Sequence, residues 1–173
     1  PFDGDLPEAM APQAVTLTLE DEIDVGRGDM LVKVGDLPHV SRGVQAHVIW
    51  MAEEQLRLQK QYSIKFVSKK AVGKIVAIEH KIDVNTLEKN ATDVDSLQLN
   101  EIALCDLSFE TPVIFDKYID NRITGAFIII DRITNGTVGA GMITRELDLA
   151  GLETPLTTAQ LQEQITAKLQ VLQ

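Results

Sequence analysis

The 173-residue sequence has one cysteine and three histidines, so it has few of the residues that hold metal ions or act as nucleophiles. A single cysteine, Cys105, excludes an intramolecular disulfide and leaves no thiol pair for a metal. Cys105 follows the apolar run 102–104, and burial without nearby cations keeps a thiol protonated, so we expect a structural thiol. The histidines His39, His47 and His80 lie far apart, and none has a metal-ligand spacing.

Long apolar runs and an excess of positive charge are also missing. Apolar runs such as 126–130 fall far short of the roughly 20 residues that span a bilayer. No signal peptide is evident, so we expect a cytoplasmic protein without a membrane partner. Sixteen Lys and Arg residues stand against 26 Asp and Glu residues, which gives a net charge of −10. This charge repels a phosphate backbone, so we expect no nucleic-acid partner.

The sequence motifs of common catalytic sites are absent. A phosphate-binding loop needs Gly-x-x-x-x-Gly-Lys followed by Ser or Thr. Around Gly73 and Lys74, Ser68 replaces the first glycine and Ile75 the hydroxyl residue. No Gly-x-Ser-x-Gly sequence is present. The acidic run 20–24 could bind a divalent cation, but a solvated sheet edge explains it as well. We therefore predict no catalytic, cofactor-binding or metal-binding residue in this chain.

The first 40 residues predict part of a β domain. Apolar and polar side chains alternate over residues 14–19, as in a half-buried strand, and a second apolar run follows at 30–32. An acidic connection with a turn at 26–29 separates the two runs. Two strands cannot close a barrel and are marginal alone. Residues 1–40 are therefore predicted to be the later part of a truncated β-barrel domain.

A second series of strands is expected after the Pro38 and Gly43 boundary. The segment 87–96 is polar and predicts a loop, and Asn135-Gly136 predicts a turn because both residues tolerate positive φ. With no long helix between the strands, the pattern favours an antiparallel barrel or sandwich. The expected strands are 44–50, 62–67, 74–82, 99–109, 125–132 and 137–143.

The tail, residues 145–173, changes to a helical period. Thr157 and Gln160 have the spacing of a capping box, so a helix is expected to begin there. Its apolar stripe would either pack on the chain's own barrel or dock on a partner. The residues of this stripe are Leu161, Ile165, Leu169 and Leu172.

Several segments together resemble a known family. The segment Gly125–Ile143 resembles the end of the third domain of translation-factor-type GTPases, where an acidic-basic pair, here Asp131-Arg132, precedes a final strand of the form Thr-Val-Gly-x-Gly. Other segments resemble the large, GTPase subunit of bacterial sulfate adenylyltransferase. These are Phe115–Tyr118, Asn121–Gly125, Asp131–Asn135, Phe2–Asp5, Leu19–Asp24, Arg27–Asp29 and Ile82–Thr86.

The resemblance implies an all-β fold. Residues 43–144 would form an antiparallel six-stranded Greek-key barrel of the translation-factor third-domain type. Residues 1–40 would be part of a second β-barrel, and residues 145–173 a tail with a short C-terminal helix.

The resemblance also implies a function for the parent protein. Its upstream GTPase domain would bind GTP and Mg, and GTP hydrolysis would drive a small catalytic subunit. That subunit would make adenylylsulfate and pyrophosphate from ATP and sulfate, in sulfate assimilation. No catalytic residue of the family maps onto this chain. We therefore expect the chain alone to be inactive and to serve docking and regulatory coupling, with the small subunit and the parent's own GTPase domain as partners.

One alternative of another class stays open. A translation elongation factor fragment binding charged tRNA should gather Lys and Arg on one face, whereas here they are dispersed apart from Lys69-Lys70. For a partner contact we predict Tyr118, Asn121 and Arg122, which lie in a polar loop before a strand. In the opposing interpretation, Arg122 only pairs locally with Asp116 or Asp120.

Overall fold

The computed structural model describes residues 4, 6–10, 12–67, 69–83, 86, 89–90 and 95–149. These residues contain seven strands. All six strands expected within residues 43–144 are present. One more, a two-residue strand, lies where the sequence predicted only loop. The strands are β1 (His39–Trp50), β2 (Gln61–Lys65), β3 (Lys70–Ile82), β4 (Lys89–Asn90), β5 (Ile102–Phe115), β6 (Ala126–Ile130) and β7 (Thr137–Glu146).

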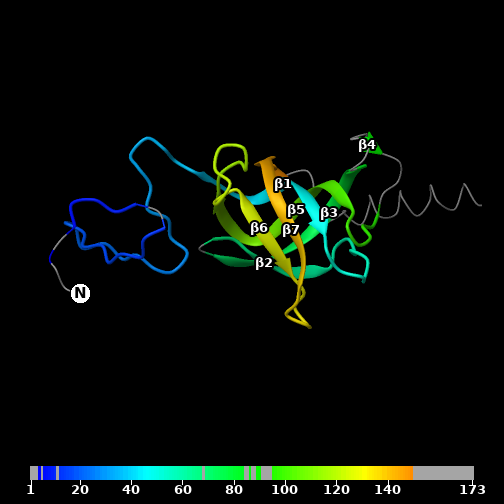
Figure 1. Ribbon diagram of the computed structural model, residues 1–173, viewed down its shortest axis with the longest axis horizontal. Helices are drawn as coiled ribbons and strands as arrows, with labels where there is room; N and C mark the ends of the chain where they lie inside the picture. Colours follow the sequence, from blue (N-terminus) through cyan, green and yellow to red (C-terminus); the bar gives the residue numbers. More distant parts are fainter. Residues whose placement is uncertain are drawn as a thin grey trace, which may run out of the picture.

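Six of these strands close into an antiparallel barrel, as predicted. The order is β2-β6-β7-β1-β5-β3, and pairing of β3 with β2 completes the ring. In the ring, β2 pairs with β3 and β3 with β5, and β1, the first strand of the chain, lies on the other side of β5. This is the Greek-key arrangement. β4 only extends the far end of β3, at Lys81 and Ile82. The ring encloses the core, and the long strands cross in front of and behind it (Figure 1).

The core follows the alternation of the strands, with aromatic rings filling the middle. On β1, Val44, Ala46, Val48 and Trp50 point inward and are buried. Cys105 is fully buried, as expected for a structural thiol, and this burial raises the pKa of the thiol to about 12. The aromatic members of the core are Trp50, Tyr62, Phe66, Phe109, Phe115 and Phe127.

The strands predicted at 14–19 and 30–32 are wrong. Neither segment belongs to a ladder, and the apolar side chains remain exposed: Leu17 is 61% and Leu31 56% accessible. The turn at 26–29 does form, with the Asp29 N–H donating to the Gly26 carbonyl at 3.2 Å. Alternation marks a strand only when a neighbouring strand supplies hydrogen-bond partners, and the described part of the chain supplies none here.

Residues 147–149 fold back beside the start of β1. The Leu147 N–H donates to the Gly43 carbonyl at 3.0 Å, and Leu147 and Leu149 are both buried. The helix predicted from Thr157, with its apolar stripe to Leu172, lies outside the described residues. Among the residues that are described, no helix is long and apolar enough to cross a membrane.

Candidate interaction surface

The described residues contain no group of three or more His, Cys, Asp or Glu side chains placed to hold a metal ion. His39 stacks on Phe115, with ring centroids 5.5 Å apart, and lies 3.6 Å from a Glu146 carboxylate oxygen. His47 is half-buried on the face opposite the core of β1. These placements are structural. The prediction that the chain carries no catalytic, cofactor or metal residue stays a prediction.

The loop 116–125 carries the three predicted contact residues and is held to β7 at both ends. The Tyr118 N–H donates to the Ile143 carbonyl at 2.8 Å, and the Ile143 N–H donates to the Gly125 carbonyl at 2.9 Å. Gly125 packs directly on the Tyr118 backbone, since a Cβ at Gly125 would lie 2.5 Å from the Tyr118 Cα. The loop therefore has a fixed base.

Asn121 organises the tip of this loop. Its Oδ1 accepts hydrogen bonds from the N–H groups of Ile123 at 3.0 Å and Thr124 at 3.4 Å, an arrangement typical of Asn in turns. Its carbonyl also accepts from the Gly125 N–H at 2.9 Å. The Thr124 hydroxyl donates to Asp116 Oδ2 at 2.5 Å. Asn121 is thus a structural residue of the loop as well as a candidate contact.

Arg122 remains exposed at the tip. It forms no ion pair within the described part of the chain, so the local pairing with Asp116 or Asp120 is not observed. Two large apolar side chains flank it: Ile119 is 89% and Ile123 65% accessible. A fixed loop that presents apolar side chains and a free guanidinium has the composition of a protein contact.

The three predicted residues face different surroundings. Asn121 lines a hollow of about 730 Å³ between the loop and residues 29–38. Tyr118 lines a second hollow of about 570 Å³ over β6 and β7. Arg122 lines neither. Figure 1 shows the 116–125 loop and the tip of the β2–β3 hairpin on the side of the barrel next to the N-terminal segment.

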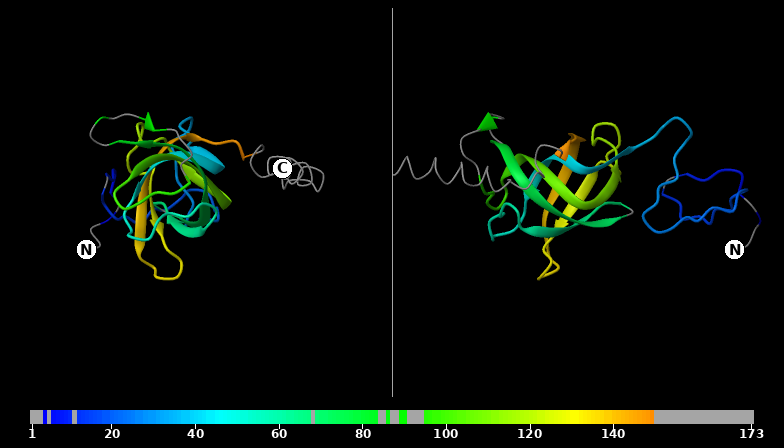
Figure 2. Two further views of the ribbon diagram at one scale, coloured as in Figure 1. Left: turned by 90° about the vertical axis from the view of Figure 1, so that its right-hand side faces the viewer. Right: turned by 180° about the vertical axis from the view of Figure 1, so that it is seen from behind.

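Asp131, the acidic residue of the Asp131-Arg132 pair, orders the turn that joins β6 to β7. Asp131 Oδ1 accepts from the N–H groups of Ile133 at 2.8 Å and Thr134 at 2.9 Å, and its Oδ2 lies 2.9 Å from Lys60 Nζ. The Thr134 amide, then Lys60 and the Ile133 amide, hold the pKa of Asp131 well below its usual range. Asn135 adopts φ 57°, as its place in a turn required. Both views in Figure 2 show this turn projecting from the barrel.

Sequence reasoning missed one feature of the surface. Lys65 and Lys70 are directly opposed across the β2–β3 hairpin, and both are exposed. Lys74 lies further along β3, opposite Gln61. The available signal was the segment 60–74, which contains five lysines and no acid. Successive side chains along each strand of a hairpin point to opposite faces of the sheet, so some of these lysines lie on the same outer face.

Comparison with known proteins gives the family. A family model described as GTP-eEF1A C-terminal domain-like matches residues 43–144, which is more than half of the chain. The chain belongs to this family. As a GTP-eEF1A C-terminal domain-like protein it also shares its fold with the crystal structure of sup35 complexed with GDP, at a TM-score of 0.60 and 18% identity. That match covers 66% of this chain and 28% of the other.

Two curated relatives of this GTP-eEF1A C-terminal domain-like chain carry the same name. It is 53% identical over 146 residues to sulfate adenylyltransferase subunit 1 of Alteromonas mediterranea, covering 84% of this chain and 31% of the relative. It is 54% identical over 148 residues to the protein of that name from Shewanella woodyi, covering 86% of this chain and 31% of the relative. The chain thus spans about a third of these relatives. The resemblance found in the sequence is confirmed.

Proposed function

We propose that this chain is the C-terminal part of a sulfate adenylyltransferase large subunit and serves as a non-catalytic docking and regulatory module. The identity of about one half to subunit 1 proteins carries this proposal. The parent complex would make adenylylsulfate and pyrophosphate from ATP and sulfate in the cytoplasm, for sulfate assimilation, and GTP hydrolysis would drive it. GTP and Mg would bind in the parent's GTPase domain, and no residue of this chain is assigned to either.

The geometry of the 116–125 loop supports a docking role. The hydrogen bonds of Tyr118 and Gly125 to Ile143 fix the loop, so little conformational entropy would be lost when a partner binds it. Ile119 and Ile123 offer apolar area, and Arg122 a free guanidinium. Arginine and buried apolar anchors are enriched at the energetic centres of protein interfaces. The partner proposed for this loop is the small catalytic subunit.

A binding assay tests the proposal. The 173-residue chain is immobilised, and recombinant small subunit from Shewanella woodyi is passed over it. We expect saturable binding, and binding several-fold weaker for Arg122→Ala. Arg57→Ala, which removes another exposed arginine outside both hollows, is the matched control and should bind like the wild type. The absence of any binding, or sulfate adenylyltransferase turnover by the chain alone, would overturn the proposal.

One observation favours a second candidate. Lys65, Lys70 and Lys74 share the outer face of the β2–β3 hairpin, and gathered cations are what a tRNA-binding elongation factor fragment would show. The net charge of −10 opposes this. In the same assay, retention of charged tRNA at moderate salt would support the elongation factor function, and retention of the small subunit would support the first proposal.

A further inference from the structure

A row of directly opposed residues crosses five strands on the outside of the barrel. Lys70 on β3 faces Lys65 on β2, and Lys65 also faces Ile128 on β6. Ile128 in turn faces Ala140 on β7, which faces Ile49 on β1. Each of these residues has at least one buried chain neighbour on its strand, so the alternation of the strands places all five side chains outward.

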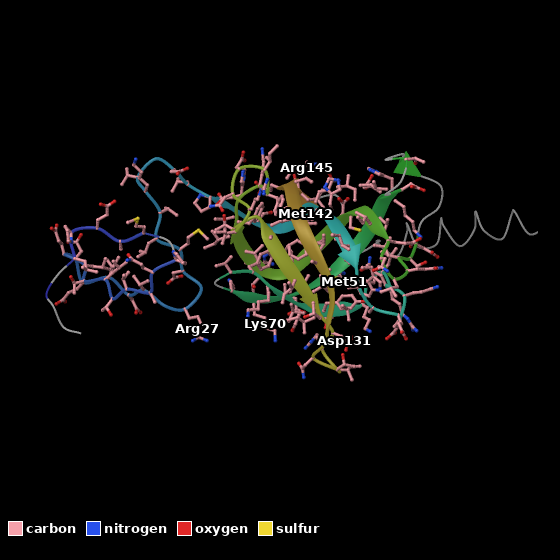
Figure 3. All side chains as sticks on the ribbon, in the orientation of Figure 1. Arg27, Met51, Lys70, Asp131, Met142 and Arg145 are labelled. Atoms are coloured by element: carbon pink, nitrogen blue, oxygen red, sulfur yellow. The ribbon has the colours of Figure 1, made fainter. Side chains whose placement is uncertain are left out.

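The apolar part of this row lies in the hollow of about 570 Å³ described above. Phe127 and Gly141 lie beneath it, and Met142 extends it along β7 (Figure 3). Val67 and Tyr118 belong to its lining as well, which connects the hollow to the base of the 116–125 loop. The outer face of β6 and β7 is therefore an apolar groove that begins beside the predicted contact loop.

Lys65 lines this groove, and Lys70 lies directly opposite Lys65 across the β2–β3 hairpin, one strand beyond the groove. Directly opposed side chains on an antiparallel pair have Cβ atoms about 4.5–5.5 Å apart, and like charges there are destabilising. Elsewhere in the chain Lys60 and Lys81 have carboxylate partners, at 2.9 and 2.6 Å. Within the described residues, neither Lys65 nor Lys70 forms an ion pair. Two exposed, directly opposed ammonium groups that lack a carboxylate partner among the described residues favour an anionic partner at this place.

We propose that this groove, with Lys65 at its rim and Lys70 opposite Lys65 on the neighbouring strand, docks an acidic, apolar surface of the small catalytic subunit. The inference rests on the proposed function and adds the place and the chemistry of the contact. Apolar side chains of the partner fill the hollow over Ile128, Ala140 and Met142. Partner carboxylates lie against the two lysines, where they replace a repulsion by two attractions. Charge complementarity of this kind guides association and fixes the orientation of the partner.

The same surface fits a nucleic acid poorly. A phosphate backbone needs cations distributed along its path, and its affinity comes from releasing counterions at each of them. Here the two lysines are at one end of the row, and the next three positions are Ile128, Ala140 and Ile49. Those apolar positions would be covered without a phosphate contact. An acidic protein surface uses both halves of the groove.

The decisive variant is Lys65→Glu in the 173-residue chain, with the dissociation constant of the Shewanella woodyi small subunit measured by titration calorimetry. The substitution converts an opposed pair of like charges into one of opposite charge, so the thermal midpoint should stay equal or rise. Binding should nevertheless weaken by about tenfold, because a rim charge now repels the partner. If Lys65→Glu weakens binding while its thermal midpoint is equal to or higher than that of the wild type, unfolding of the variant cannot explain the weaker binding.

Three further variants separate charge from apolar contact. Ile128→Ser should also weaken binding by about tenfold, since it removes apolar area from the floor of the groove. Ile133→Ser removes an exposed isoleucine from the β6–β7 turn, outside the groove, and should bind within about twofold of the wild type. Arg57→Glu is the matched charge reversal outside the groove and should likewise leave binding unchanged.

The outcomes distinguish the inference from the proposed function. If the wild-type chain fails to bind the small subunit, the proposed function is wrong and the inference falls with it. If the wild type binds and both Lys65→Glu and Ile128→Ser bind equally well, the inference alone is overturned. If the wild type retains tRNA and Lys65→Glu releases it, the face belongs to a nucleic acid and the inference is also overturned.

Discussion

Single glycines decide how closely the aromatic core approaches β7. The Phe127 ring lies against Gly141, and a Cβ at that position would overlap three of its ring atoms. Phe127 is 3% accessible and its ring also contacts the Phe66 ring, at 5.6 Å between centroids, so a shift of the ring would disturb the aromatic core. We predict that Gly141→Ala destabilises the barrel by about 1–3 kcal/mol, as overpacking does, measured by urea unfolding. Gly136→Ala, whose Cβ would lie 3.4 Å from Thr134 Oγ1, is the control and should change little.

Asp131 makes the β6–β7 turn sensitive to acid. The lowered pKa of Asp131 means that the folded state favours the ionised carboxylate. The carboxylate therefore stabilises the folded state fully at pH values above the pKa of an unfolded Asp, which is about 4. This stabilisation is lost as the pH falls through the folded value. We predict that Asp131→Asn lowers the thermal midpoint by several degrees at pH 7, and that the gap to the wild type narrows below pH 4. A gap that stays constant down to pH 2 would contradict this.

Asp131→Ala separates the two roles of that side chain. The amide of Asn can still accept from the Ile133 and Thr134 N–H groups, whereas Ala cannot. The alanine variant should therefore be less stable than the asparagine variant at every pH. Equal thermal midpoints of the two variants would show that only the ion pair with Lys60 matters.

At the scale of the elements, alternation in the sequence predicted the barrel strands because each has a partner within the chain. The same signal at residues 14–19 was wrong, because the described residues contain no strand to pair with it. β4 was missed because two residues are too few for a periodic signal. The Lys65–Lys70 pair and the groove beside it depend on register between strands, and spacing along the chain does not determine register.

The N-terminal segment should be dispensable for the barrel. Residues 12–37 contribute no strand, so removing residues 1–38 should leave the thermal midpoint within a few degrees of the full chain. Trypsin should cut first at Arg27 and Lys33, which are exposed and lie outside any ladder. A digestion time course followed by mass spectrometry tests both points. A barrel that unfolds when the segment is removed would contradict the prediction.

At the scale of the whole molecule, the sequence predicted that Tyr118, Asn121 and Arg122 share a loop, but it did not predict the surroundings of that loop. Tyr118, Asn121 and Arg122 do share one loop, yet Asn121 mainly supports the turn and Tyr118 belongs to the groove over β6 and β7. Long-range hydrogen bonds of the loop to Ile143 determine these positions, and no local pattern encodes such bonds. Two of the segments that carried the family resemblance, Asn121–Gly125 and Asp131–Asn135, lie in turns, where the backbone restricts the choice of residue.

We propose that this barrel is the docking part of a sulfate adenylyltransferase large subunit. Sedimentation velocity of the 173-residue chain mixed with the small subunit, in the presence of equimolar tRNA, tests it most directly. We expect the chain and the small subunit to sediment together as a one-to-one complex while tRNA sediments alone. Separate sedimentation of the two proteins, or movement of the chain with tRNA, would contradict it.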